Sequence, residues 1–180
     1  SCGEKSLLGY ENIDASGKQG MEELRKENPN FEKAVDNLET SWKNSQKNPE
    51  VLIALSNTKV KLEQQRSNKQ QVIPPIVKTI PVMIPASASI SEKSMPIGFL
   101  VAVGEAQRAW NNTRHDWLLQ VIIGNDENEP NIAKKHVVQQ IINRPTIIGT
   151  VGPYSSYVAE GILPTYTNNK MTLISGTSTS

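Results

Sequence analysis

The C-terminal stretch of the chain, residues 147–180, constrains the fold more than any other stretch. Two short apolar runs, at residues 147–151 and 171–174, each suit a buried strand of a parallel sheet. Residues 158–167 lie between them and suit a helix, and a loop of small hydroxyl residues follows each run. Right-handed crossovers place both loops at the carboxyl ends of neighbouring strands. The pattern therefore predicts an α/β fold whose ligand site is formed by these two loops.

The residues of the two loops suit the recognition of a carboxylate. Hydroxyl groups, together with free backbone N–H groups at the start of a helix, are good partners for a small anion. The stretch contains no nucleophile–base pair, so it predicts binding of an anionic or zwitterionic solute rather than catalysis. The candidate ligand-binding residues are Ser155, Ser156, Tyr157, Thr177, Ser178 and Thr179.

Two motifs in this stretch resemble a known family. The sequence GPYSS at residues 152–156 and the sequence LISGTSTS at residues 173–180 are similar to the first lobe of type I periplasmic solute-binding proteins, in the leucine/isoleucine/valine-binding branch. The resemblance covers residues 79–180, and it implies that Ser156 binds the α-carboxylate of a ligand. It also implies that Thr177 and Thr179 contact the carboxylate and the ammonium. Gly176 departs from the pattern, because the family commonly has proline there.

The resemblance implies a function as well as a site. We expect an extracytoplasmic component of an ABC-type amino-acid transporter, which binds a small amino acid or a similar carboxylate and needs no cofactor. Its partners would be the ligand and a membrane permease or receptor, and its location periplasmic, with an anchor possible upstream. The family closes two lobes on its ligand, so we expect this chain to be a fragment or a truncated product. The alternative is a ligand-sensing or scaffold protein that uses its helical part for protein–protein contact.

The first seventy residues have a different character. We expect a flexible leader at residues 1–19 and a helical segment at 20–70, in which apolar side chains recur at helical spacing. The segment resembles one tetratricopeptide-type unit followed by a further helix. It is either an appendage packed on its neighbour or part of a peptide-binding groove. The residues expected in its core are Phe31, Ala34, Leu38 and Trp42.

A proline-rich linker is expected at residues 71–78, because Pro74 and Pro75 stiffen the chain there. The lobe then occupies residues 79–180, with further strands at 79–85 and 117–123 and helices at 96–111 and 131–143. Alternating strands and helices predict a three-layer fold, a parallel sheet with helices on both faces. The first strand should lie between the second and the third. Pro81 should lie near the start of its strand, because proline lacks the N–H that a sheet needs.

Composition and motifs exclude several classes of function. The chain has 19 basic and 18 acidic residues and only 5% aromatics, which gives no support to nucleic-acid binding. The single cysteine, Cys2, excludes an internal disulfide; it is either an ordinary thiol or a lipid-bearing cysteine. Asp126 and Asn128 alternate as in half a calcium loop, but the later glycine and glutamate are missing, which favours a structural turn. The two histidines lack the spacing of a zinc site. No metal site is therefore expected.

Overall fold

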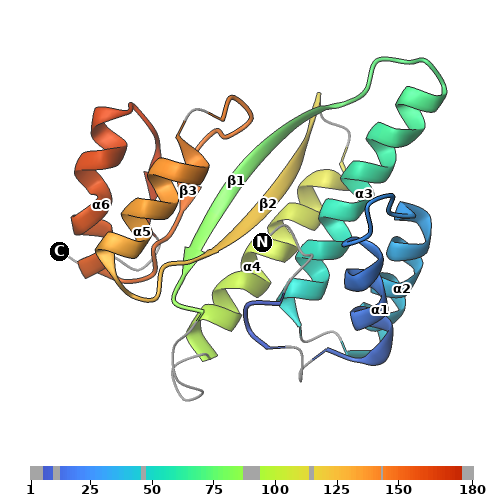
Figure 1. The fold of residues 1–180 in the computed structure, drawn as a ribbon, viewed down its shortest axis with the longest axis horizontal. Helices are drawn as coiled ribbons and strands as arrows, with labels where there is room; N and C mark the ends of the chain where they lie inside the picture. Colours follow the sequence, from blue (N-terminus) through green and yellow to red (C-terminus); the bar gives the residue numbers. More distant parts are fainter. Residues whose placement is uncertain are drawn as a thin grey trace. The chain divides into compact units, whose positions relative to one another are not determined.

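The computed structural model describes residues 6–9, 13–45, 48–86, 94–113, 116–142 and 144–175. Three helices come first, α1 (Ala15–Glu23), α2 (Phe31–Ser45) and α3 (Pro49–Lys69), and strand β1 (Ile76–Ile84) follows them (Figure 1). The remaining elements are α4 (Ser94–Asn111), β2 (Trp117–Asn125), α5 (Pro130–His136), the π-helix η2 (Val137–Ile141), β3 (Thr150–Val151), α6 (Ser156–Asn168) and β4 (Leu173–Ile174).

The strands form one parallel sheet in the order β2-β1-β3-β4. This confirms the expected α/β class and the expected position of the first strand between the second and the third. The chain thus places β2 on one side of β1 and then crosses to the other side for β3 and β4. In open α/β sheets, the carboxyl ends of the strands at such a reversal are the place where ligands bind.

Pro81 lies inside β1, five residues after its first residue, and not near its start as expected. The pairing with the third strand shows how the sheet accommodates it. Thr79 pairs with Ile147 and Val82 pairs with Val151, so three steps along β1 correspond to four steps along the partner. The extra residue lies opposite the proline, which has no N–H to donate there. This bulge is one reason that β3 has only two residues, where the apolar run had predicted five.

The structure has two compact units, and β1 and β2 contribute residues to both. Unit 1 is Ser1–Val77 with Ile97–Val121, and unit 2 is Lys78–Pro96 with Ile122–Ser180. Helix α4 therefore groups with the N-terminal helices, whereas the sequence had assigned it to the lobe that begins at residue 79. The linker expected at residues 71–78 overlaps the first strand, because β1 begins at Ile76.

The expected leader at residues 1–19 is partly ordered as helix. Helix α1 begins at Ala15, because the Asp14 carboxylate accepts a hydrogen bond of 2.8 Å from the Gly17 N–H and so caps the first turn. Further upstream, the buried Glu50 carboxylate accepts bonds from the Ser6 hydroxyl (2.6 Å) and from the backbone N–H groups of Leu7 (2.6 Å) and Leu8 (3.1 Å). These bonds attach the segment to the start of α3.

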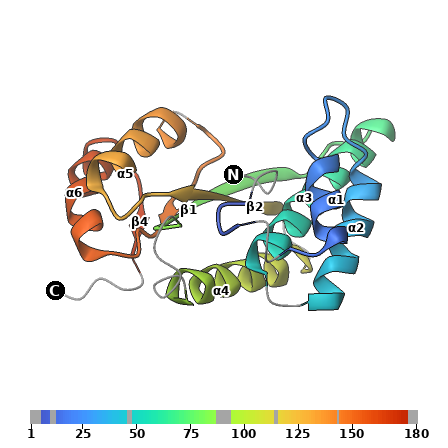
Figure 2. The ribbon, with the colours of Figure 1, turned by 60° about the horizontal axis from the view of Figure 1, so that its bottom comes forward.

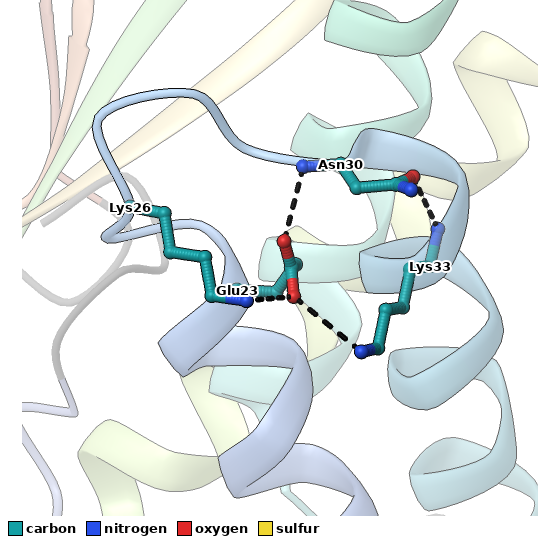
Figure 3. A network of polar contacts seen from close by, with 4 residues as sticks. All are labelled: Glu23, Lys26, Asn30 and Lys33. Atoms are coloured by element: carbon teal, nitrogen blue, oxygen red, sulfur yellow. Dashed lines mark hydrogen bonds and ion pairs between the residues drawn. The ribbon is translucent and has the colours of Figure 1, made fainter.

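A polar network closes the turn between α1 and α2 (Figure 3). The Glu23 carboxylate at the end of α1 accepts a bond of 2.7 Å from the Lys26 ammonium and one of 3.2 Å from the Asn30 N–H. Lys33 lies at 3.9 Å from the same carboxylate, and its backbone N–H donates to the Asn30 side chain, which caps α2. The bond from Lys26 is the main cause that lowers the pKa of Glu23 below its usual value.

Helices α1, α2 and α3 pack together around one apolar cluster (Figure 2). Ala34 and Leu38 are fully buried in it, and Phe31 and Trp42 are partly buried at its margin. These four residues had been expected in the core. The sequence had divided this helical segment from the lobe by a linker, whereas in the structure α3 bonds directly to β2.

The bond between α3 and β2 is made by the Asn57 side chain, which is 1% exposed. Its Nδ2 donates to the Val121 carbonyl (2.7 Å), and its Oδ1 accepts from the Val121 N–H (3.0 Å). The Asn111 side chain of α4 does the same for Leu119, with both distances 2.8 Å. Each amide replaces the backbone of a neighbouring strand, at the edge where β2 has no strand partner.

Two further side chains complete this arrangement, which we call the edge cap (Asn57, Gln107, Trp110 and Asn111). The buried Gln107 Nε2 donates to the Leu119 carbonyl (3.0 Å) and to Asn57 Oδ1 (2.8 Å). Trp110 Nε1 donates to the Trp117 carbonyl (3.3 Å), and the two indole rings are in contact, with centroids 4.5 Å apart and planes tilted by 35°. Residues 117, 119 and 121 are every second residue of β2, so their backbone N–H and C=O groups point to the same edge of the strand.

Replacing Asn57 with alanine should remove the centre of the edge cap. The backbone N–H and C=O of Val121 and one donor bond of Gln107 would lose their buried partner, and each unsatisfied group costs about 1–3 kcal/mol. We expect the free energy of unfolding to fall by about 3 kcal/mol, measured by urea denaturation.

The matched control is Asn68→Ala, which changes the same residue type in the same helix at an exposed position. It should change stability by less than about 0.5 kcal/mol. Equal stability losses in the two variants would show that the edge cap contributes nothing specific.

Candidate functional site

The candidate site lies in unit 2, at the carboxyl ends of β1, β3 and β4. Residues 152–155 connect β3 to α6, and Ser175 follows β4. The loop after β1 is described only at residues 85 and 86. The strand order places the first of these connections beside β1, at the reversal point of the sheet.

Gly152 fixes the path of the chain out of β3. Its φ is +86°, a left-handed conformation, and a Cβ atom built on it would clash with the Met83 carbonyl oxygen of β1. Only glycine allows the two backbones to approach so closely. The Gly152 N–H donates to the Ile174 carbonyl of β4 (2.8 Å), so the turn is held from both neighbouring strands.

Ser155 and Ser156 lie at the start of α6, which begins two residues before the helix expected at 158–167. Ser155 is the capping residue with extended backbone angles, and its carbonyl accepts the first helical bond, from the Ala159 N–H (2.9 Å). Its hydroxyl makes no capping bond to the helix. Both serines are half-buried, whereas the Tyr157 side chain is 63% exposed. Tyr157 therefore points its ring to solvent, and its backbone N–H is the part available at the helix start.

A hydrogen bond connects the start of the second hydroxyl loop to the first loop. The Ser175 hydroxyl donates to the Pro153 carbonyl over 3.2 Å, so the chain that leaves β4 lies beside the chain that enters α6. The remaining predicted ligands, Thr177, Ser178 and Thr179, lie outside the described residues, as does Gly176. The structure thus brings the Ser155–Ser156 region together with the start of the second loop, at Ser175.

The helices of unit 2 share an apolar core with β1, the strand beside this loop region. A cluster of buried apolar side chains joins β1, α5, η2 and α6, and Figure 2 shows α5 and α6 packed together. Gly161 of α6 faces Pro130 of α5 so closely that a Cβ atom would lie 2.5 Å from the proline ring. The cluster consists of Met83, Ala133, Val137, Ile141, Val158, Ile162 and Tyr166.

Asp126 follows β2 and forms a turn at the same edge of the sheet. Its N–H donates to the Ile84 carbonyl (2.9 Å), and its Oδ1 accepts from the Asn128 N–H (2.9 Å). The neighbouring Asn125 side chain accepts from the Ala86 N–H (2.8 Å). Asp126 is 1% exposed, and Oδ2 has no hydrogen-bond partner among the described residues. Burial raises the pKa of this carboxyl above its usual value. The described part of the chain contains no group of three potential metal ligands.

Unit 1 contains a feature that sequence reasoning missed, a cavity of about 700 Å³. Its walls come from α2, α3, the chain before β1, the end of α4, and β2, so no local motif predicts it. The only feature of the sequence that could have indicated the cavity is the helical spacing of Glu39, Trp42 and Lys43 on α2. The lining residues are Glu39, Trp42, Lys43, Leu55, Ser56, Lys59, Val60, Glu63, Pro75, Arg108, Asn111, Asn112 and Leu118.

Gly152→Ala should destabilise the candidate site. The substitution forces alanine into a left-handed conformation and against the Met83 carbonyl. We expect a loss of about 2 kcal/mol or more in the free energy of unfolding. The control is Gly98→Ala on α4, where a Cβ atom meets nothing within 4 Å. That variant should gain about 0.5–1 kcal/mol from helix propensity. A harmless Gly152→Ala would contradict the close approach of the two backbones.

Asp126→Asn should stabilise the protein at neutral pH. The folded-state pKa of Asp126 is raised, so the contribution of this carboxyl to stability is fully present below about pH 4 and is lost as the pH rises through the folded-state pKa. Asparagine keeps the acceptor for the Asn128 N–H and carries no charge. The variant should therefore exceed the wild type by about 1 kcal/mol at pH 7, and the difference should shrink below pH 4. Urea denaturation across pH measures it, with the exposed Glu160→Gln as control. A difference independent of pH would contradict the raised pKa.

No family model, curated protein or solved structure matches this chain. Within the described ranges, none of the helices has the length and apolar character needed to cross a membrane.

Proposed function

We infer that unit 2 binds a small carboxylate-bearing metabolite, such as an amino acid, at the hydroxyl loops after β3 and β4. The bond from the Ser175 hydroxyl to the Pro153 carbonyl carries this inference, because it joins the two loops that the sequence had singled out separately. The reversal point of the sheet lies at the same edge, between β1 and β3.

The chemistry of the site suits a carboxylate. The first N–H groups of α6, from Ser156 onward, have no carbonyl partner within the helix and carry its partial positive charge. The Ser155 and Ser156 hydroxyls adjoin them. These groups can replace the hydration of a carboxylate without a buried counter-charge. In this proposal Thr177, Ser178 and Thr179 add hydroxyl and backbone groups from the second loop.

The resemblance to type I periplasmic solute-binding proteins supports the wider proposal. The protein would act outside the cytoplasm as the binding component of an ABC-type amino-acid transporter, and it would deliver its ligand to a membrane permease. Its role would be binding and not catalysis, and it would need no cofactor. A second lobe would close over the ligand, as in the resembled family.

One observation favours the alternative, a ligand-sensing or scaffold protein with a tetratricopeptide-like helical part. The connection between α3 and β1 exposes neighbouring apolar side chains, with Val72 53%, Ile73 94% and Ile76 63% exposed. Exposed apolar residues that cluster in this way are typical of contact with another protein. In the transporter proposal, the same residues would contact the permease or the second lobe.

Ser156→Ala tests the binding site. Each hydrogen bond to a charged group contributes about 1.5–3 kcal/mol, so the variant should bind its amino acid about ten-fold more weakly or worse. The measurement is calorimetric titration of branched-chain and polar amino acids against the natural protein that contains this chain. Thr167→Ala, an exposed position on the same helix, is the control and should leave affinity unchanged.

Equal affinities of the wild type and Ser156→Ala would remove Ser156 from the site. Failure of every amino acid to bind would instead favour the scaffold function.

A further inference from the structure

The cavity of unit 1 is a second place where this chain can hold a small molecule. Its volume of about 700 Å³ lies within the range of roughly 300–1,000 Å³ that ligand sites occupy. All of its lining residues belong to unit 1, so it shares none with the hydroxyl loops of unit 2.

One part of the lining is apolar. Leu55 and Val60 on α3 are buried, and Leu118 on β2 is half-buried. Trp42 on α2 is also half-buried, so its indole is held by the helical core while it contributes to the cavity wall. A wall of this kind favours a ligand with an apolar or aromatic body.

The rest of the lining carries both signs of charge. Glu39 and Lys59 form an ion pair of 2.6 Å, so they largely compensate each other. The Lys59 bond lowers the pKa of Glu39, which keeps this carboxylate ionised. A ligand that carried a single charge would pair only with lining groups of the opposite sign and would leave the lining groups of its own sign without a partner in the ligand.

Two charged residues on different helices can serve such a ligand. Arg108 on α4 is paired with Glu105 at 2.7 Å, but its side chain is 49% exposed, and Glu105 does not line the cavity. An exposed pair of this kind stabilises little, so Arg108 can turn to a carboxylate at small cost. Glu63, which is exposed on α3, offers a carboxylate for an ammonium.

We propose that this cavity binds a small zwitterion with an apolar side chain, of the class of the aromatic amino acids. The ring lies against Trp42 and the apolar wall, the carboxylate bonds to the Arg108 guanidinium, and the ammonium bonds to Glu63. This site is separate from the proposed carboxylate site of unit 2 and does not depend on it.

Three probes of equal ring size test the charge requirement. Phenylalanine, 3-phenylpropionate and phenethylamine are titrated calorimetrically against the whole chain in the Ser156→Ala background, which weakens binding at the other proposed site. Phenylalanine should bind at least about five-fold more tightly than either analogue, because each analogue lacks one charged group. Equal binding of an analogue, or no binding of phenylalanine, would overturn the proposal.

Two variants locate the contacts. Arg108→Gln and Glu63→Gln should each weaken phenylalanine binding about five- to ten-fold, since each removes one charged hydrogen bond at a partly exposed site. Glu105→Gln is the matched control: it removes the present partner of Arg108 without touching the cavity, and affinity should stay within about two-fold. Urea denaturation checks that each variant is folded. Binding that is unchanged in Arg108→Gln or Glu63→Gln would overturn the assignment of that residue.

Discussion

The pair of hydrogen bonds between the Asn57 side chain and the Val121 backbone is the contact on which the arrangement of unit 1 depends. An edge strand presents backbone groups that need partners, and β2 is an edge strand of this sheet. Asn57 supplies one donor and one acceptor at the spacing of a strand, and Asn111 repeats this at Leu119. Side-chain amides of α3 and α4 therefore supply hydrogen-bond partners for the backbone of β2, in addition to the burial of apolar surface.

This contact explains which parts of the organisation could be predicted from the sequence. The strand order was expected from the alternation of strands and helices along the chain, and it is confirmed. Apolar periodicity is a local signal that predicted most of the helices, but it missed the start of α1 at Ala15 and the π-helix η2. It did not predict that α3 and α4 belong to one unit with β2, because a capping amide looks like any polar residue in a sequence. Helix α3 also lacks a single apolar face: every residue of Pro49–Thr58 is buried. Because this part of α3 is enclosed by its neighbours, its sequence has no polar face from which the buried face could be predicted.

The two candidate sites also differ in whether their residues are close together in the sequence. The position of the first hydroxyl loop could be predicted because strand, glycine, serine and helix follow one another in the chain, and a parallel sheet places such loops at one edge. The cavity could not, because its walls join residues from position 39 to position 118. Trp42 shows the limit clearly. Its spacing predicted a core residue, and it is partly one, but only the packing of α3, α4 and β2 shows that it also borders a cavity.

Two buried carboxyl groups, those of Glu50 and Asp126, differ in the number of hydrogen bonds that they accept. Glu50 is 1% exposed and receives three hydrogen bonds from Ser6, Leu7 and Leu8, so its charge serves to hold the N-terminal segment. Asp126 is equally buried, yet among the described residues only Asn128 donates to its side chain, and one oxygen has no partner. Burial of an unpaired charge is costly, and such costs persist most often where they serve function. The buried carboxyl of Asp126 and the left-handed Gly152 both lie at the carboxyl edge of the sheet, beside the proposed ligand site of unit 2.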